Sequence, residues 1–355
     1  MRMSRLFLFL FLAFPLWLQA QDEAHQPRPA VQARLADKAL LLDVINTGQQ
    51  FVAAGERGIV LTSGDGQQWT QAETVPVQST LTRLAFVGEQ LWAVGHDSTI
   101  IHSSDAGRTW SLQNFEPENE EPLFDVHFFD DRNGLAIGAY GLILHTDDGG
   151  QSWQQAYMAD ELTGEAIDWP DVEQRAAVGE DDDDGLEEDD DLYDSAADFD
   201  RGCYEFLECH LNALVAVDGQ GLMIAAEGGY GFRSEDAGQS WESFRFPYAG
   251  SMFGLVAVGS EILAYGLRGH AQLTSDFGRS WRELDTGISS NIMGAAVTGS
   301  GQVMLVGNGA SILAYDPATD QFTASQNQLG NDYAAVAVRT DGSLIVTGAG
   351  GIKNE

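Results

Sequence analysis

The chain has 355 residues, of which 44% are hydrophobic, and its 54 acidic and 18 basic residues give a formal net charge of −36 at pH 7. Such a charge argues against nucleic acid and anionic membrane surfaces as partners. The apolar content is ample for a core, and the length suits one propeller or barrel.

The first twenty residues have the pattern of a cleaved secretory signal. Arg2 and Arg5 precede an uncharged apolar stretch over residues 6–18, and the small residue Ala20 ends the segment. The stretch is shorter than the ~20 residues that a membrane-spanning helix needs, and no cysteine follows Ala20 to carry a lipid. We therefore predict a signal peptide over 1–20 and a mature chain over 21–355 without a membrane span. The expected location is the periplasm.

The mature chain repeats one phrase, Ser/Thr-x-Asp-x-Gly-x-x-Trp. It occurs as SSDAGRTW (103–110), TDDGGQSW (146–153), SEDAGQSW (234–241) and TSDFGRSW (274–281). Weaker copies and a second repeated phrase ahead of each box bring the number of units to seven. Each unit of about 42 residues contains four short apolar segments separated by Gly, Asn and Asp turns, a pattern typical of strands. The sequence therefore predicts an all-β fold, a seven-bladed β-propeller with four-stranded antiparallel blades.

The last unit ends at Glu355 after about three strands, without a box. We expect residues 29–35 (PAVQARL) to supply its missing outer strand, because a ring closed by its own N-terminus exposes no open sheet edge.

Each clean box places an Asp two residues before a Gly and five before a Trp. These residues are Asp105, Asp148, Asp236 and Asp276, with Trp110, Trp153, Trp241 and Trp281. We expect the Asp to accept hydrogen bonds from its own turn, the Gly to supply a positive φ, and the Trp to fill the wedge between blades. The alternative role, as metal ligands or catalytic acids, is disfavoured because copies on different blades lie too far apart to meet one substrate. We predict a scaffold, with no catalytic residue and no metal site. In the first and sixth units, Asp65 and Asp316 are displaced by one position, so we expect their turns to be less well stabilised.

Residues 160–208 form an insert between the third and fourth units, with twenty-one acidic and two basic residues. We expect it to be largely disordered. Its role is left open between a solubilising loop, an electrostatic arm for a basic partner and a weak Ca²⁺ site, since its acids do not match the spacing of a dedicated calcium loop. No other cofactor is expected. Cys203 and Cys209 are predicted to form a disulfide, because the compartment is oxidising; metal binding by the two thiols is the lesser alternative.

Six residues near the turns between the second and third strands are the candidate binding site, because loops on a rigid scaffold are free to vary. They are Arg57, His96, Tyr140, Tyr230, Arg268 and Asn308. In a propeller these turns and the connections between blades share one face. The alternative is that each is simply a solvated turn residue.

The boxes are the Asp-box, or bacterial neuraminidase repeat, and LAIGAYGLILHTDDGGQSW (135–153) resembles the photosystem II stability/assembly factor family. The resemblance covers residues 38–353 apart from the acidic insert, which departs from the family pattern. It implies a seven-bladed propeller that binds newly made membrane-protein subunits.

We therefore expect a non-enzymatic, exported and monomeric protein that binds a protein partner, as an assembly or accessory factor for a membrane or envelope complex. The alternative is a sialidase-like or other glycan-processing propeller, since sialidases share the box. It is disfavoured because the first unit lacks an Arg-Ile-Pro-like phrase and no defensible Tyr–Glu pair is present.

Overall fold

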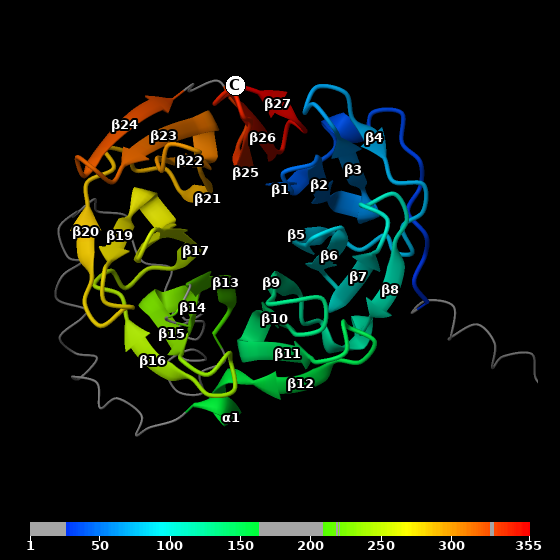
Figure 1. Cartoon of the computed structure of the whole chain (residues 1–355), viewed down its shortest axis with the longest axis horizontal. Coiled ribbons are helices and arrows are strands. Elements are labelled where there is room, and N and C mark those ends of the chain that lie inside the picture. Colours follow the sequence, from blue (N-terminus) through cyan, green and yellow to red (C-terminus); the bar gives the residue numbers. More distant parts are fainter. Residues whose placement is uncertain (1–25, 163–208, 218, 220, 327–329) are drawn as a thin grey trace, which may run out of the picture.

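The computed structural model describes residues 26–162, 209–217, 219, 221–326 and 330–355. Figure 1 shows seven sheets arranged as blades around a central axis, with the chain passing once round the ring from β1 to β27. Within each blade the strands pair in sequence order and antiparallel, from the axis outward. The predicted seven-bladed propeller is confirmed.

The strands follow one another blade by blade. Blade 1 contains β1 (Leu41–Asn46), β2 (Phe51–Gly55), β3 (Val60–Ser63) and β4 (Thr70–Gln71). Blade 2 contains β5 (Leu81–Val87), β6 (Gln90–Gly95), β7 (Thr99–Ser103) and β8 (Ser111–Asn114). Blade 3 contains β9 (Leu123–Phe128), β10 (Gly134–Gly138), β11 (Leu142–Thr146) and β12 (Gln154–Tyr157). Blade 4 contains β13 (Leu211–Val217), β14 (Gly221–Ala226), β15 (Tyr230–Ser234) and β16 (Glu242–Arg245).

Blade 5 contains β17 (Met252–Val258), β18 (Glu261–Gly266), β19 (Ala271–Thr274) and β20 (Arg282–Leu284). Blade 6 contains β21 (Ile292–Val297), β22 (Val303–Gly307), β23 (Ser311–Asp316) and β24 (Gln321–Gln326). Blade 7 contains β25 (Tyr333–Val338), β26 (Leu344–Gly348) and β27 (Lys353–Asn354). The short helices are η1 (Ala36–Lys38), η2 (Glu56–Gly58), η3 (Pro117–Asn119), η4 (Ala139–Gly141), α1 (Met158–Glu161), η8 (Glu227–Gly229), η9 (Leu267–Gly269) and η10 (Asn308–Ala310). No helix in the described ranges combines the length and the apolar character needed to cross a membrane.

The core lies between the blades. The second strand of each blade is an unbroken apolar run, such as FVAAG in β2 and GLAIG in β10, and every residue of these two strands is buried. Both faces of such a strand pack against neighbouring blades, so no polar alternation is needed. These strands end close to the inner strand. A Cβ on Gly138, for example, would collide with the carbonyl oxygen of Pro122, so only glycine fits there.

The ring closes by packing rather than by a shared strand. Blade 7 has three strands, all from the C-terminal end of the chain. Its Ile345 packs with Leu41 and Leu61 of blade 1 in one buried cluster, and the Ile352 N–H donates to the carbonyl of Asp37 over 2.9 Å.

The prediction that residues 29–35 complete blade 7 is wrong. This segment lies instead along the outer edge of blade 1, where the Ala30 N–H donates to Val75 over 2.9 Å and the Gln32 side chain donates to Ala72 over 2.7 Å. The outermost strand of blade 1 has only two residues, which leaves backbone groups at that edge for the N-terminal segment to meet.

Candidate functional site

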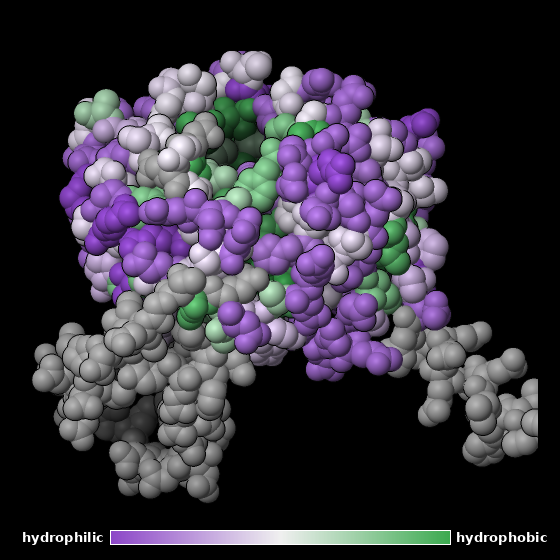
Figure 2. Space-filling model, turned by 60° about the horizontal axis from the view of Figure 1, so that its bottom comes forward, coloured by the Kyte–Doolittle hydropathy of each residue, from purple (hydrophilic) through white to green (hydrophobic). Residues whose placement is uncertain are grey.

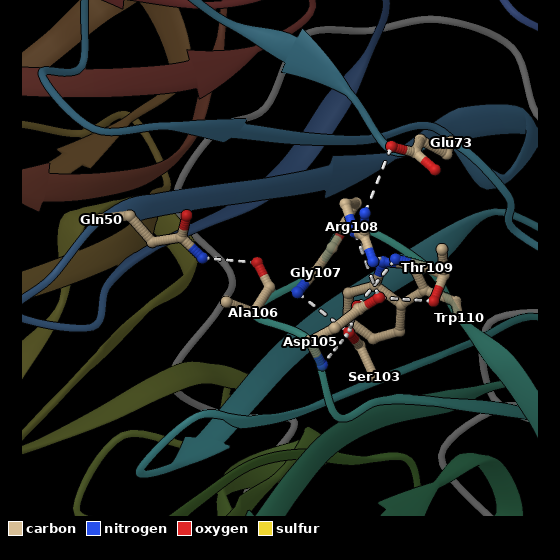
Figure 3. A network of polar contacts seen from close by, with 9 residues as sticks. All are labelled: Gln50, Glu73, Ser103, Asp105, Ala106, Gly107, Arg108, Thr109 and Trp110. Atoms are coloured by element: carbon tan, nitrogen blue, oxygen red, sulfur yellow. Dashed lines mark hydrogen bonds and ion pairs between the residues drawn. The ribbon is translucent and has the colours of Figure 1, made fainter.

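The Asp-box is a closed network of hydrogen bonds, shown for blade 2 in Figure 3. One oxygen of Asp105 accepts the Thr109 N–H over 2.8 Å, and the other accepts the Thr109 hydroxyl over 2.7 Å. The Ser103 hydroxyl donates to Asp105 over 2.9 Å and accepts the Gly107 N–H over 2.9 Å. Gly107 has a φ of 85°, and the Trp110 indole N–H donates to its carbonyl over 3.0 Å. The Asp therefore fixes the turn by accepting donors from both of its sides.

The bonds of the Asp carboxylate and of the first hydroxyl recur in the boxes of blades 3, 4 and 5. The backbone N–H groups of Ser152, Ser240 and Ser280 donate to Asp148, Asp236 and Asp276 over 2.8 to 2.9 Å, and the hydroxyls of the same serines donate to the second carboxylate oxygen. The sequence reasoning missed the flanking hydroxyls, although Ser or Thr stands at both positions in every clean box.

These bonds also explain the ionisation of the box carboxylates. Burial alone would raise the pKa of Asp105, but the donors from Thr109 and Ser103 outweigh it and hold that pKa at about 2. Around Asp148 the Ser152 hydroxyl and N–H lower the pKa to about 2. A carboxylate this acidic is a poor proton donor at neutral pH. Within the described ranges, no group of three or more His, Cys, Asp or Glu side chains could hold a metal ion.

The box tryptophans lie in the wedges between blades. Trp110 is buried among residues of blades 1 and 2, including Val52 and Leu91. Trp241 is buried among residues of blades 3 and 4, including Ile137. Trp153 and Trp281 are partly buried; Trp153 packs between blades 2 and 3, and Trp281 packs between blades 4 and 5. Their position explains why the residue repeats.

The two irregular boxes still form turns. In blade 1 the displaced Asp65 accepts the N–H groups of Gln67 and Gln68 over 2.8 and 2.9 Å, and the Trp69 indole still reaches the carbonyl of Gly66. In blade 6 the turn is shorter: the Asp316 carboxylate accepts the Ala318 N–H over 2.9 Å, and the Asp316 backbone carbonyl accepts the N–H groups of Thr319 and Asp320 over 3.2 and 2.9 Å.

The turns between second and third strands lie on the same face as the connections between blades. The N–H groups of Glu56, His96 and Ala139 in these turns donate to the carbonyls of Leu40, Thr80 and Pro122 in the connections, over 2.9 Å each. The same link recurs in blades 5, 6 and 7. We call this surface the turn face; the boxes and the hairpins between first and second strands lie on the opposite side, the box face.

Three of the six candidate residues stand at one equivalent position on the turn face. Arg57, Tyr140 and Arg268 have φ values of 55°, 54° and 54°, and all three side chains are exposed. Blades 4 and 6 have Gly228 and Gly309 at this position, with φ of 62° and 67°. Blade 2 has Asp97 there, with φ of 60°. The apex is thus left-handed in blades 1 to 6, and blades 1, 3 and 5 meet it with a large side chain.

The other three candidates lie elsewhere. His96 is exposed and Asn308 half-buried, each one residue before the apex of its turn. Tyr230 follows its turn, is 2% exposed and belongs to the core between blades 3 and 4, with the Arg245 guanidinium 3.7 Å from its ring. The structure therefore distributes five candidates around the turn face in different blades and places the sixth inside the molecule.

Two aromatic sets adjoin the apex residues. Next to Tyr140, the His210 ring lies 5.1 Å from the Tyr140 ring and 5.7 Å from that of Phe124, and the backbone N–H of His210 donates to the Glu227 carboxylate over 3.0 Å. In blade 5, two residues beyond Arg268, the His270 ring stacks on Tyr248 at 3.6 Å and lies 2.7 Å from a Glu283 oxygen. No repeated residue type marks these positions, so sequence patterns could not identify them.

A charged cluster lies on the inner strands, at a bulge that every inner strand contains. Arg83 on β5 lies 3.8 Å from an Asp43 oxygen on β1 and 3.4 Å from an Asp125 oxygen on β9. The second oxygens of Asp43 and Asp125 accept the N–H groups of Leu84 and Leu214, each over 2.8 Å. Each carboxylate thereby ties its blade to the inner strand of the next.

Burial governs the ionisation of this cluster. It raises the pKa of Asp43, against the opposing effects of Arg83 and the Leu84 N–H. Burial would lower the pKa of Arg83, but the Asp125 and Asp43 carboxylates outweigh it and raise that pKa. Burial raises the pKa of Tyr265 in blade 5 to about 12, and the charges of Arg83, Asp125 and Asp43 also act on this hydroxyl.

Several predictions fall outside the described ranges. These are the signal peptide, residues 163–208 of the acidic insert and Cys203. Cys209 is fully buried. The disulfide, the insert's role and its Ca²⁺ site stay predictions.

Comparison with known proteins confirms the resemblance. Residues 61–178 match the model of the family described as photosynthesis system II assembly factor YCF48. The photosystem II assembly lipoprotein Ycf48 of Prochlorococcus marinus is 40% identical over 75 residues, which are 21% of this chain and 21% of that protein. The chloroplastic photosystem II stability/assembly factor HCF136 of Arabidopsis thaliana is 30% identical over 91 residues, 24% of this chain and 22% of that protein. The uncharacterized Bacillus subtilis protein YkuO is 32% identical over 108 residues, 30% of this chain and 34% of that protein. The matches span only 21% to 34% of these relatives' length.

Solved structures match over nearly the whole chain. A structure of YCF48 bound to D1 peptide has a TM-score of 0.62 at 15% identity, covering 89% of this chain and 91% of that one. YCF48 from Cyanidioschyzon merolae has the same TM-score at 14% identity, covering 89% and 94%. At such identities the likeness is one of fold. The chain therefore resembles the photosystem II assembly factor family in its repeat sequence, and it shares the propeller fold of YCF48.

Proposed function

We propose that this chain is a non-enzymatic assembly or accessory factor that binds a segment of a partner protein on its turn face. The observation that carries the proposal is the set of three exposed side chains, Arg57, Tyr140 and Arg268, held at a left-handed backbone position.

Folding alone does not explain these three residues. The position accepts glycine, as blades 4 and 6 show, and a left-handed backbone costs a side-chain-bearing residue about 1–2 kcal/mol. A left-handed backbone alone does not mark a binding site, since Ala106, Ala237 and Phe277 adopt it in the box turns. The three apex side chains differ from these in being large, exposed and charged or polar. Among the described residues, neither Arg57 nor Arg268 forms an ion pair that would give its guanidinium an internal role.

The chemistry of the three side chains suits a polypeptide ligand. A guanidinium binds carboxylates and backbone carbonyls through several N–H donors, and a tyrosine ring supplies apolar contact area with a polar tip. The turn face presents these groups on a rigid ring in separate blades, so an extended segment could contact more than one.

The comparisons support the same reading. Two of the named relatives are photosystem II assembly factors, and YCF48, which shares the fold, was solved with a D1 peptide. For this chain we infer export to the periplasm, action as a monomer, and a partner that is a subunit of a membrane or envelope complex.

Affinity capture from detergent-solubilised membranes tests the proposal. The tagged wild type is compared with a triple variant, Arg57→Ser, Tyr140→Ser and Arg268→Ser, and we expect the variant to lose the captured partner. The matched control removes two arginines and one glutamine from exposed, mutually equivalent box positions in blades 2, 3 and 5 on the opposite face. It carries Arg108→Ser, Gln151→Ser and Arg279→Ser. Equal capture by both variants would overturn the assignment to the turn face.

A further inference from the structure

A side chain of one blade donates a hydrogen bond to the box turn of the next blade at several points around the ring. In Figure 3 the Gln50 amide of blade 1 donates to the Ala106 carbonyl of blade 2, over 2.6 Å. The Gln113 amide of blade 2 donates to the Gly149 carbonyl of blade 3, over 2.8 Å. Ala106 and Gly149 both stand directly before the box glycine, so the carbonyl at this position can join two blades.

Arginine side chains bridge three further wedges in a similar way. They are Arg233 to the Phe277 carbonyl, Arg339 to the Asp65 carbonyl and Arg282 to the Asp320 carboxylate, over 3.4, 3.3 and 3.0 Å respectively. These bonds join blade 4 to blade 5, blade 7 to blade 1 and blade 5 to blade 6. Among the described residues, the box turn of blade 4 is the only one that no side chain of the preceding blade reaches by a hydrogen bond.

Ala237 occupies the bridged position in blade 4. Its φ of 60° matches the 59° of Ala106, so the two carbonyls belong to equivalent turns. Within the described ranges, no side chain of blade 3 donates to the Ala237 carbonyl. Asn133, which like Gln50 directly precedes the second strand of its blade, donates its amide to Asp130 in its own hairpin instead, over 2.8 Å. The wedge between blades 3 and 4 therefore stays open at this point.

A cavity of about 580 Å³ lies at this opening, on the box face. Its size is within the range of about 300–1,000 Å³ that is usual for small-molecule sites. The residues of its wall that matter here are Phe129, Asp130, Asp147, Gln154, Ala237 and Gln239. None of the described residues in the wall belongs to an inner strand, so the cavity is separate from the central channel. Figure 2 shows one end of that channel as a hollow with hydrophobic residues in its wall.

The wall of the cavity is accessible to solvent and carries negative charge. Phe129 is 41% exposed, and Asp147 and Ala237 are exposed as well. Backbone and side-chain N–H donors in its own hairpin lower the pKa of Asp130, so this carboxylate is ionised at neutral pH. Among the described residues no lysine or arginine lines the cavity, and the neighbouring Arg132 donates to the Asp147 backbone carbonyl over 3.1 Å. A cationic ligand is therefore favoured over an anionic one.

The other wedges indicate which cation fits. Between blades 4 and 5 and between blades 7 and 1, the group that donates to the box carbonyl is a guanidinium. A guanidinium has five N–H donors in one plane, so it can bond to a carbonyl and a carboxylate together, and its plane stacks on aromatic rings. An ammonium group has neither the plane nor the forked donors.

We propose that the cavity binds a small molecule that carries a guanidinium group. Its N–H groups donate to the Ala237 carbonyl and pair with the Asp147 carboxylate, and its plane lies against the Phe129 ring. The ligand thereby supplies the bridge that blade 3 does not. The site lies on the box face and does not depend on partner binding at the turn face.

Isothermal titration calorimetry of the full chain at physiological ionic strength tests the proposal with L-argininamide, L-citrullinamide and L-lysinamide. Citrullinamide has the shape of argininamide with a neutral urea group. Lysinamide has the charge of argininamide without the planar fork, so it also measures general attraction to an acidic chain. We expect saturable binding of argininamide at one site per chain, at least tenfold tighter than binding of either analogue. No saturable binding of argininamide, or equal affinity for lysinamide, would overturn the proposal.

Two variants check that binding reports this cavity. Asp147→Asn should weaken the binding of L-argininamide at least tenfold. The matched control, Asp131→Asn, removes the same charge from an exposed residue that does not line the cavity, and it should leave the affinity unchanged. Equal weakening by both variants would show general electrostatic attraction and would remove the site.

A peptide distinguishes a free ligand from a partner's side chain. N-acetyl-Ala-Arg-Ala-amide presents the same guanidinium group on a polypeptide, and we expect it to bind no more tightly than L-argininamide. Tighter binding of the peptide would assign the cavity to an arginine of a partner protein and overturn the small-molecule proposal. None of these experiments alters the turn face, so their failure leaves the capture experiment unaffected.

Discussion

Replacing the three apex residues by glycine should separate binding from folding. The variant carries Arg57→Gly, Tyr140→Gly and Arg268→Gly, which removes every side-chain atom from the proposed contact and relieves the backbone. Most substitutions that abolish binding also destabilise a protein, so an opposite change in the two properties is informative.

The magnitude follows from the backbone angles. A φ near 55° costs a residue with a Cβ about 1–2 kcal/mol relative to glycine, and this cost disappears in the variant. Glycine also gives the unfolded chain more freedom, which takes back about 0.4–1 kcal/mol per site. The net gain is about 0.5 kcal/mol per site, so the triple variant should be about 1–2 kcal/mol more stable than the wild type. Arg57 and Arg268 are exposed and contribute little packing to set against this, whereas Tyr140→Gly also removes the ring contact with His210.

Two measurements on the same preparations check this expectation. Urea unfolding followed by tryptophan fluorescence gives the free energy of unfolding, and affinity capture gives partner binding. We expect a higher urea midpoint together with loss of capture. A variant that unfolds more easily would refute the strain argument, and one that still captures the partner at wild-type level would refute the binding assignment.

Three further predictions concern the scaffold. Asp105→Ala should lower the free energy of unfolding by about 1–3 kcal/mol, since it strands the donors of its turn, while capture survives. The folded pKa of Asp105 is about 2, below its unfolded value near 3.9. The difference in free energy of unfolding between the wild type and the variant, measured by urea unfolding, should therefore be complete above about pH 5 and disappear as the pH falls towards 2. Arg83→Leu should cost about 3 kcal/mol at pH 7 by leaving two buried carboxylates unpaired. The deficit should shrink as the pH falls and Asp43, whose pKa burial already raises, becomes protonated; a deficit independent of pH would contradict the charge pairing. Mass spectrometry of exported protein, alkylated before reduction, should find neither Cys203 nor Cys209 labelled, and labelling of both would remove the predicted disulfide.

The fold could be predicted because the repeat is local. The eight residues of each box predict its turn, and the apolar runs before the box predict the strands. Seven such repeat units therefore predict seven blades. The way in which the ring closes could not be predicted from such a local pattern. Residues 29–35 are compatible with an outer strand of either blade 7 or blade 1, and only long-range packing, such as Ile345 against Leu41, decides between them.

The candidate site was predictable only in part. Arg57, Tyr140 and Arg268 could be found because a side chain replaces glycine within a repeated turn. Tyr230 was placed with them by its nearness in sequence, but one change of register moves a side chain from the surface into the core. No sequence pattern identified Arg83, because its position depends on a bulge in its strand and on two carboxylates from other blades.

Site-specific photocrosslinking in intact cells tests the central claim, that the turn face binds a partner protein. A photoreactive phenylalanine analogue is placed at position 140 on the turn face or, as a control, at position 151 on the box face; both positions are exposed. We expect a discrete protein adduct from position 140 and none from position 151. An adduct from position 151 alone, or the same adduct from both positions, would contradict it.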